Sequence, residues 1–200
     1  MWPHLEIPLL GYSGPTHAFV LIVAVLTGNI LVTVTARHFD GLPAKRVLAG
    51  AVLLGLAALV GARAHYVVLR LHWFRLFPAS IFELRYAGYH AFGGLVGVLV
   101  AAPLISRALH LPFGKWIDAS LAAGAVSIVI ARIGCLLNGC CFGTPCSYFW
   151  CLHYPAASGP YFAHLELGII DEHALTSAPV HPIALYFAAA AAFVACLAYL

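Results

Sequence analysis

Long apolar stretches separated by short charged turns dominate the chain. No Asp, Glu, Lys or Arg lies between Glu6 and Arg37. Because a helix needs about 20 apolar residues to cross a bilayer core, each such stretch predicts a transmembrane helix. The expected spans are residues 17–36, 47–69, 92–105, 116–136 and about 182 onward. We therefore predict an all-α, polytopic membrane helix bundle with about five spans, and treat residues 1–200 as a single transmembrane domain.

Two segments interrupt this pattern. Residues 70–91 mix arginines with aromatic side chains, which is typical of an interfacial or re-entrant segment, and Pro78 argues against one continuous helix there. The arginines are Arg70, Arg75 and Arg85. Residues 138–180 form a long loop with four prolines, and loops of this length are usually functional.

The distribution of Lys and Arg predicts the orientation in the membrane. Residues 37–46 carry three of these cations and residues 107–115 carry two, whereas residues 138–180 and the N-terminal segment carry none. By the positive-inside rule, the N-terminus and the 138–180 loop then lie outside. The arginines of residues 70–91 lie on the same outer side, where they either bind a specific anionic ligand or contact lipid headgroups without specificity.

Composition and charge narrow the class of protein. Only 8% of the residues are charged and 63% are hydrophobic, whereas a soluble domain carries about 25% charged residues. The chain is therefore an integral membrane protein. The formal net charge of +3 comes with no basic patch interleaved with aromatic residues, so we expect no nucleic-acid partner.

Arg132 is the most informative single residue. It lies near the end of an apolar span, where an arginine is costly unless it has a partner or reaches the headgroups. A guanidinium matches a phosphate in shape and charge, and Gly134, Gly139 and Gly143 permit sharp turns and close approach of a ligand. We predict an anion-binding element at the membrane surface, where the helix that carries Arg132 gives way to a glycine-rich break. The alternative is an arginine that only anchors a helix end.

Polar residues also gather at the predicted outer ends of the other spans. Because these ends share one membrane depth, a helix bundle can bring them around one cavity that faces the outer leaflet. The residues are His17, Arg63, His65, His90, Gly93, Gly94, Arg132, Asn138, His181 and Tyr186.

Three motifs in fixed order carry a resemblance to a known family. They are Ala91-Phe92-Gly93-Gly94-Leu95-Val96-Gly97, Arg132-Ile133-Gly134 with Asn138-Gly139 and Gly143, and His181-Pro182-x-x-Leu185-Tyr186. They resemble the signatures of the prolipoprotein diacylglyceryl transferase family, in particular a cysteine-rich branch with a Gly-Cys-Cys pattern. The resemblance covers about residues 15–190, since Gly61-Ala62-Arg63, Tyr66 and His17 fit it as well.

The resemblance implies a bacterial plasma-membrane enzyme. Such an enzyme moves the diacylglyceryl group of phosphatidylglycerol, a membrane lipid, to a cysteine thiol of a lipoprotein precursor, without a cofactor or metal. Arg132 would stabilise the phosphate and His90, or else His181, would act as the base. The substrate-binding residues would be Arg63, Asn138, Gly139, Gly93, Gly94, His17, His181 and Tyr186.

The chain departs from the family's pattern at three places. Phe92 stands where the family often has a histidine, and Cys135 and Cys140 stand where it often has Asn and Glu. We also expect the chain to lack the family's last helices. These departures keep open an alternative function, a non-catalytic membrane homologue that binds anionic lipid.

Five cysteines lie close together in the sequence, at Cys135, Cys140, Cys141, Cys146 and Cys151. They could form disulfides, bind a metal or act as redox-active thiols. We favour disulfides or unpaired structural cysteines, because the loop is predicted to lie on the oxidising side and no C-x-x-C pair indicates zinc. A membrane protein that handles thiols or metals is the second alternative function.

Overall fold

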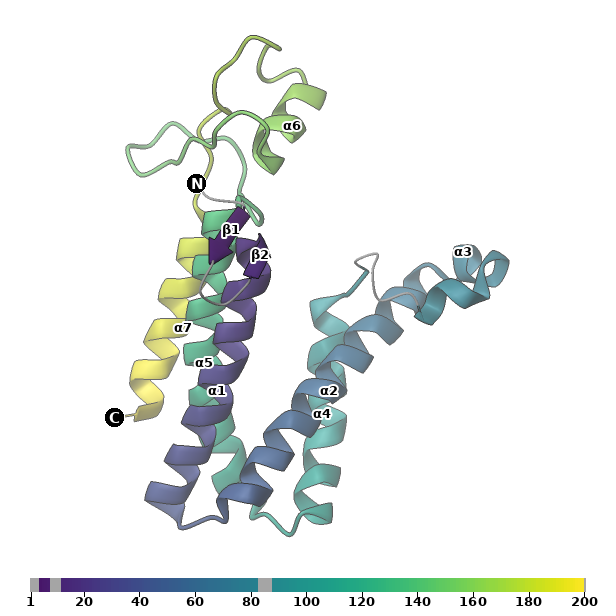
Figure 1. Cartoon of the computed structure of the whole chain (residues 1–200), viewed down its shortest axis with the longest axis vertical. Helices are drawn as coiled ribbons and strands as arrows, with labels where there is room; N and C mark the ends of the chain where they lie inside the picture. The colour runs from purple at the N-terminus through teal and green to yellow at the C-terminus, as the bar shows by residue number, and fades with distance from the viewer. Residues whose placement is uncertain (1–3, 8–11, 83–87, 200) are drawn as a thin grey trace. The chain divides into compact units, whose positions relative to one another are not determined.

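A computed structural model describes residues 4–7, 12–82 and 88–199. Helices long and apolar enough to cross a membrane are α1 (Thr16–Asp40), α2 (Ala44–Leu69), α4 (Ala91–Ala108) and α5 (Phe113–Asn138). A shorter apolar helix, α7 (Ile183–Tyr199), follows near the end. The prediction of a polytopic helical membrane protein is thus confirmed (Figure 1).

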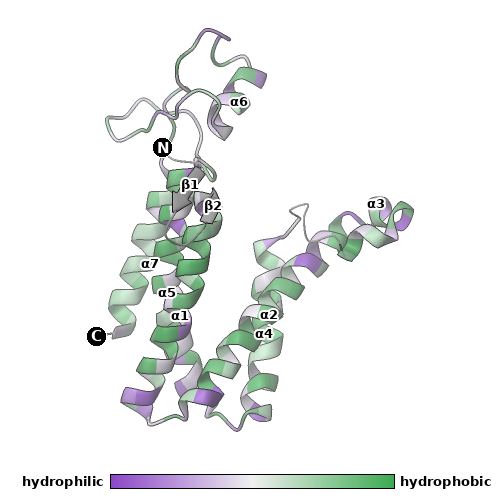
Figure 2. Cartoon of the chain, viewed as in Figure 1, coloured by the Kyte–Doolittle hydropathy of each residue, from purple (hydrophilic) through white to green (hydrophobic). Residues whose placement is uncertain are grey.

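Hydrophobic residues predominate along these helices (Figure 2), and many of them are exposed. Leu26, Val60 and Leu99 are all more than half exposed, at 57%, 68% and 64%. Such exposure would be unfavourable in water, but it is what a helix surrounded by lipid chains requires.

The segment after α2 is broken where Pro78 predicts a break. A short helix, α3 (Leu71–Leu76), ends just before the proline, and a 3-10 helix, η2 (Pro78–Phe82), follows it. Proline lacks a backbone N–H and its ring clashes with the preceding helical turn, which explains the interruption. Arg85 lies outside the described residues.

The N-terminal segment and the long loop also contain short elements of secondary structure. Strand β1 (His4–Ile7) pairs antiparallel with β2 (Tyr12–Pro15), a hairpin that the apolar pattern did not predict. Within the long loop, α6 (Gly159–Glu166) begins at Ser158, whose Oγ accepts a hydrogen bond from the Tyr161 amide at 3.3 Å. Such N-capping satisfies an amide that the helix itself leaves unpaired.

The chain divides into two compact units, residues 1–28 with 121–200, and residues 29–120. In the first, the start of α1 packs on the end of α5, where a Cβ at Gly134 would lie only 2.9 Å from Val20 Cβ. In the second, α2 and α4 run side by side (Figure 1). The prediction of a single transmembrane domain stays a prediction.

Candidate functional site

In the unit of residues 29–120, the glycines of α4 bring two helices into close contact. A Cβ on Gly61 of α2 would collide with the carbonyl oxygen of Gly93, and one on Gly97 would collide with that of Ala57. Gly94 is equally confined, because its Cβ would lie 3.2 Å from a carbonyl oxygen of α2. Small residues spaced four apart allow this approach in membrane helices. The glycine motif therefore packs α4 on α2, and its predicted contact with substrate stays a prediction.

Arg63 of α2 holds the segment that follows α3. Its Nε donates to the carbonyl of Ile81 at 3.2 Å, Nη1 to that of Gly88 at 3.2 Å, and Nη2 to that of Ser80 at 2.7 Å. Three aromatic rings have their centroids 5.5 to 5.8 Å from its Cζ atom, those of Tyr66, Phe74 and Tyr89. The guanidinium thus ties Ser80, Ile81 and Gly88 to α2, and its predicted role in headgroup binding stays a prediction.

An apolar cavity lies beside this arginine. It has a volume of about 530 Å³ and lies between one face of α2, with Val60 and Val67, and the segment with Ile81, Phe82 and Tyr89. Almost its whole wall is hydrocarbon. A cavity of this kind accepts an alkyl chain and has few groups that could hold a polar ligand.

His90, the predicted base, directly precedes α4. Its backbone amide donates to the carbonyl of Ala62 at 3.1 Å, and its exposed ring meets the ring of His65 edge-on, with centroids 5.3 Å apart. The Phe92 ring lies 5.6 Å from His65, so the residue in place of the family's histidine belongs to the same cluster. The contacts with α2 therefore fix where the His90 ring lies.

In the unit of residues 1–28 and 121–200, α5 continues past Arg132 and ends at Asn138, two residues beyond the end expected at residue 136. The glycine-rich break follows at Gly139. Gly139 has a φ of 73°, its amide bonds to the carbonyl of Leu136 at 3.3 Å, and the amide of Cys140 bonds to that of Cys135 at 3.2 Å. This pair of bonds is the Schellman C-cap, which favours glycine at the left-handed position.

Arg132 is partly buried, and its guanidinium lies beside an aromatic ring and a thiol. Its Cζ lies 4.7 Å from the ring centroid of Phe187, and Nη1 lies 3.7 Å from Sγ of Cys141. Among the described residues, no carboxylate forms an ion pair with it; Asp40 and Lys115 form one elsewhere, at 3.4 Å. The guanidinium therefore retains donors for an external anion.

The start of α7 carries a hydrogen-bonded aromatic cluster. Trp150 Nε1 donates to Tyr186 Oη at 2.9 Å, and the same oxygen lies 3.0 Å from Nδ1 of His181. Gly143 donates its amide to the carbonyl of His181 at 3.0 Å, and a Cβ there would lie 2.8 Å from that oxygen. The close approach explains why a glycine follows the cysteines.

The cysteines divide into one disulfide and a free group. Cys146 and Cys151 are bonded to each other, whereas Cys135, Cys140 and Cys141 are free. Burial raises the pKa of the Cys140 thiol, and the neighbouring Cys141 adds to the rise. The Cys146–Cys151 bond agrees with the disulfide interpretation for these two residues.

The predicted site residues come together as two groups, one in each unit. Residues 29–120 hold the first group, Arg63, His65, His90, Gly93 and Gly94. Residues 1–28 and 121–200 hold the second, His17, Arg132, Asn138, Gly139, His181 and Tyr186. One shared cavity stays a prediction. Phe187 and Trp150 were not predicted, although Phe187 directly follows the motif tyrosine.

The membrane-spanning helices, together with Arg132, which has no acidic partner in the described part of the chain, define a multi-pass membrane protein with a candidate anion site. Residues 10–200 match the family described as prolipoprotein diacylglyceryl transferase, and the chain belongs to that family. The resemblance of the motifs is thereby confirmed.

Several relatives carry the name phosphatidylglycerol–prolipoprotein diacylglyceryl transferase. One from Dehalococcoides mccartyi strain BAV1 is 31% identical over 119 residues, which are 58% of this chain and 44% of that protein. One from Finegoldia magna is 24% identical over 161 residues, 80% of this chain and 64% of that protein. One from Synechococcus elongatus is 29% identical over 157 residues, covering 76% and 54%. The chain spans about half the length of these relatives.

Proposed function

We propose that the protein transfers the diacylglyceryl group of phosphatidylglycerol to a cysteine thiol of a lipoprotein precursor. The observation that carries this proposal is Arg132, a partly buried guanidinium near the end of a membrane helix with no carboxylate partner among the described residues. Membership of the family supports the same reaction. The membrane is the bacterial plasma membrane, with the N-terminus and residues 138–180 outside.

The reaction needs an activated thiol and a stabilised leaving group. A base takes the thiol proton, because the thiolate is the nucleophile. The thiolate attacks the carbon of the diacylated glycerol that is bonded to a phosphate oxygen. A C–S bond forms and the bond from that carbon to the phosphate oxygen breaks. Glycerol phosphate leaves with the electron pair of that bond. No oxidant or reductant is required.

Arg132 supplies the stabilisation of the leaving group. A guanidinium binds two phosphate oxygens at once, and charge-assisted bonds of this kind are about twice as strong as neutral ones. The Phe187 ring contacts the planar guanidinium through a cation–π interaction and helps to orient it. Since the ring is neutral, the positive charge remains available to the phosphate. Negative charge grows on the phosphate as the C–O bond breaks, so the contact strengthens in the transition state.

His181 is better suited to donate a hydrogen bond than to act as the base. Trp150 donates to Tyr186 Oη, and in the His181 tautomer that accepts at Nδ1 the tyrosine donates its proton to that nitrogen. A neutral ring that accepts at Nδ1 carries its proton on Nε2, which then donates to an anionic group. We therefore assign the base to His90, whose ring is exposed.

The remaining residues shape the donor site. Asn138 ends α5 and Gly139 directly follows it, while His17 lies in the first turn of α1. We assign all three to binding of the donor headgroup. Arg63 positions Ser80, Ile81 and Gly88, the Gly93–Gly94 pair positions α4, and the apolar cavity beside Arg63 receives an acyl chain.

The test is transfer by the purified protein in vesicles of phosphatidylglycerol. A precursor peptide with the acceptor cysteine should gain one diacylglyceryl group for each glycerol phosphate released. The same peptide with serine at the acceptor should gain none. Binding of phosphatidylglycerol without any transfer would refute the enzyme and favour the non-catalytic, lipid-binding alternative, to which Phe92 in place of histidine points.

A further inference from the structure

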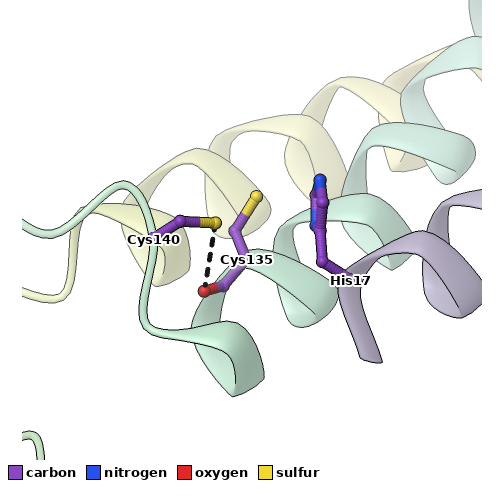
Figure 3. Close-up of side chains that lie close together, drawn as sticks. All are labelled: His17, Cys135 and Cys140. Carbon is purple, nitrogen blue, oxygen red and sulfur yellow. Dashed lines mark hydrogen bonds between the residues drawn. The ribbon is translucent and has the colours of Figure 1, made fainter. Parts of the chain in front are cut away.

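Three potential metal ligands from distant parts of the chain lie together beside the end of α5. A ring nitrogen of His17 and the sulfur atoms of Cys135 and Cys140 all lie within 4.8 Å of one another. Figure 3 shows that the imidazole comes from the start of α1, one thiol from the last turns of α5, and the other from the chain just after that helix. The mechanism proposed above does not use the two thiols.

The fold holds each of the three in place. The Schellman cap turns the chain back over the end of α5, and the Cys140 thiol lies 3.7 Å from the carbonyl oxygen of Cys135. Gly134 lets α1 approach so closely that a Cβ there would lie 3.5 Å from Nδ1 of His17. The three ligand atoms are therefore positioned by a helix cap and a helix crossing, not by one flexible loop.

The histidine has a polar atom that nothing in the described structure satisfies. His17 Nδ1 is fully buried and has no hydrogen-bond partner among the described residues. Cys135, beside it, is only 7% exposed. Burying a polar atom without a partner costs roughly 1–3 kcal/mol by mutational estimates, so the site is incomplete without a further ligand.

We propose that His17, Cys135 and Cys140 bind a thiophilic metal ion, with Zn²⁺ as the representative. Tetrahedral zinc with bonds of about 2.3 Å to sulfur and 2.0–2.1 Å to nitrogen holds its ligand atoms roughly 3.6–3.8 Å apart. The observed span of up to 4.8 Å needs only about 1 Å of closure by side-chain rotation. Two thiolates neutralise the dication, and the fourth position remains for a water molecule.

The two thiols have no part in the proposed transfer reaction, whereas His17 belongs to both sites. The sequence did not predict it, because Cys135 and Cys140 lack the C-x-x-C spacing and His17 belongs to another helix. The inference replaces the expectation that the chain binds no metal. It also gives a reason for two cysteines where the family often has Asn and Glu.

The experiment measures the metal directly. The full chain, purified in detergent under reducing conditions, is loaded with Zn²⁺, desalted and analysed by mass spectrometry for metal per chain. We expect one equivalent, and with Co²⁺ a thiolate-to-metal absorption band. Cys135→Ser and Cys140→Ser should each weaken binding by more than about 100-fold, since even outer-shell changes cost about 10- to 100-fold.

Matched variants separate ligand loss from other effects. Cys196→Ser removes a free, exposed cysteine on α7, and His173→Ala removes an exposed histidine of the long loop. Both should keep the full equivalent, whereas His17→Ala should lose it. Helical content by circular dichroism checks that each variant is folded.

Two outcomes would overturn the proposal. The first is wild-type protein that retains no metal and shows no thiolate-to-cobalt band, a result that needs no variant. The second is a full equivalent that persists in the folded Cys135→Ser, Cys140→Ser double variant.

Discussion

Replacing Arg132 by lysine should slow transfer while leaving the protein folded. Lysine keeps the positive charge but loses the planar fork and most of the contact with the Phe187 ring, whose centroid lies 4.7 Å from the guanidinium. Removing one preorganised donor to a developing anion costs about 2.7–4 kcal/mol, or roughly 100- to 1,000-fold in rate. A simple helix anchor predicts no such loss, because lysine reaches the headgroups as well as arginine does.

The assay is diacylglyceryl transfer to a precursor peptide at matched amounts of folded protein. The rate constant should fall more than the apparent affinity for phosphatidylglycerol, because the lost contact strengthens in the transition state. Arg107→Lys is the control, since Arg107 is an exposed arginine in the last turn of α4. Equal rates for wild type and Arg132→Lys would refute the role of Arg132 and leave it a membrane anchor.

Three further predictions test the topology, the base and the packing. After reduction, Cys146 and Cys151 should react with a membrane-impermeant thiol reagent on intact cells, and labelling only after lysis would invert the orientation. His90→Ala should abolish transfer but preserve binding to phosphatidylglycerol vesicles; full activity would assign the base elsewhere. Gly61→Ala should destabilise the protein by about 1–3 kcal/mol, because its Cβ meets a backbone carbonyl of α4. Gly55→Ala, with nothing within 4 Å of its Cβ, should leave the melting temperature nearly unchanged, and an equal Gly61→Ala melting temperature would contradict the packing.

The transmembrane helices could be predicted from the sequence because they depend on local properties. The span expected at residues 17–36 appears as Thr16–Asp40, and the break expected at Pro78 separates α3 from η2. Apolar length and the missing amide of proline act on neighbouring residues, so no distant contact is needed to foresee them. The motifs likewise led to the family, since their order is a property of the sequence alone.

The tertiary structure decided what individual side chains do. The sequence predicts a ligand contact for Gly93, and the structure adds a role in packing, because a Cβ there would meet the carbonyl of Gly61 on the facing helix. The sequence predicts that Arg63 binds a lipid headgroup, and the structure shows that three backbone carbonyls of a later segment accept hydrogen bonds from it. His17 meets Cys135 and Cys140 only because two helices cross at Gly134. Contacts between residues far apart in the chain depend on how helices pack, and hydropathy does not encode that packing because lipid-facing and buried positions are both apolar.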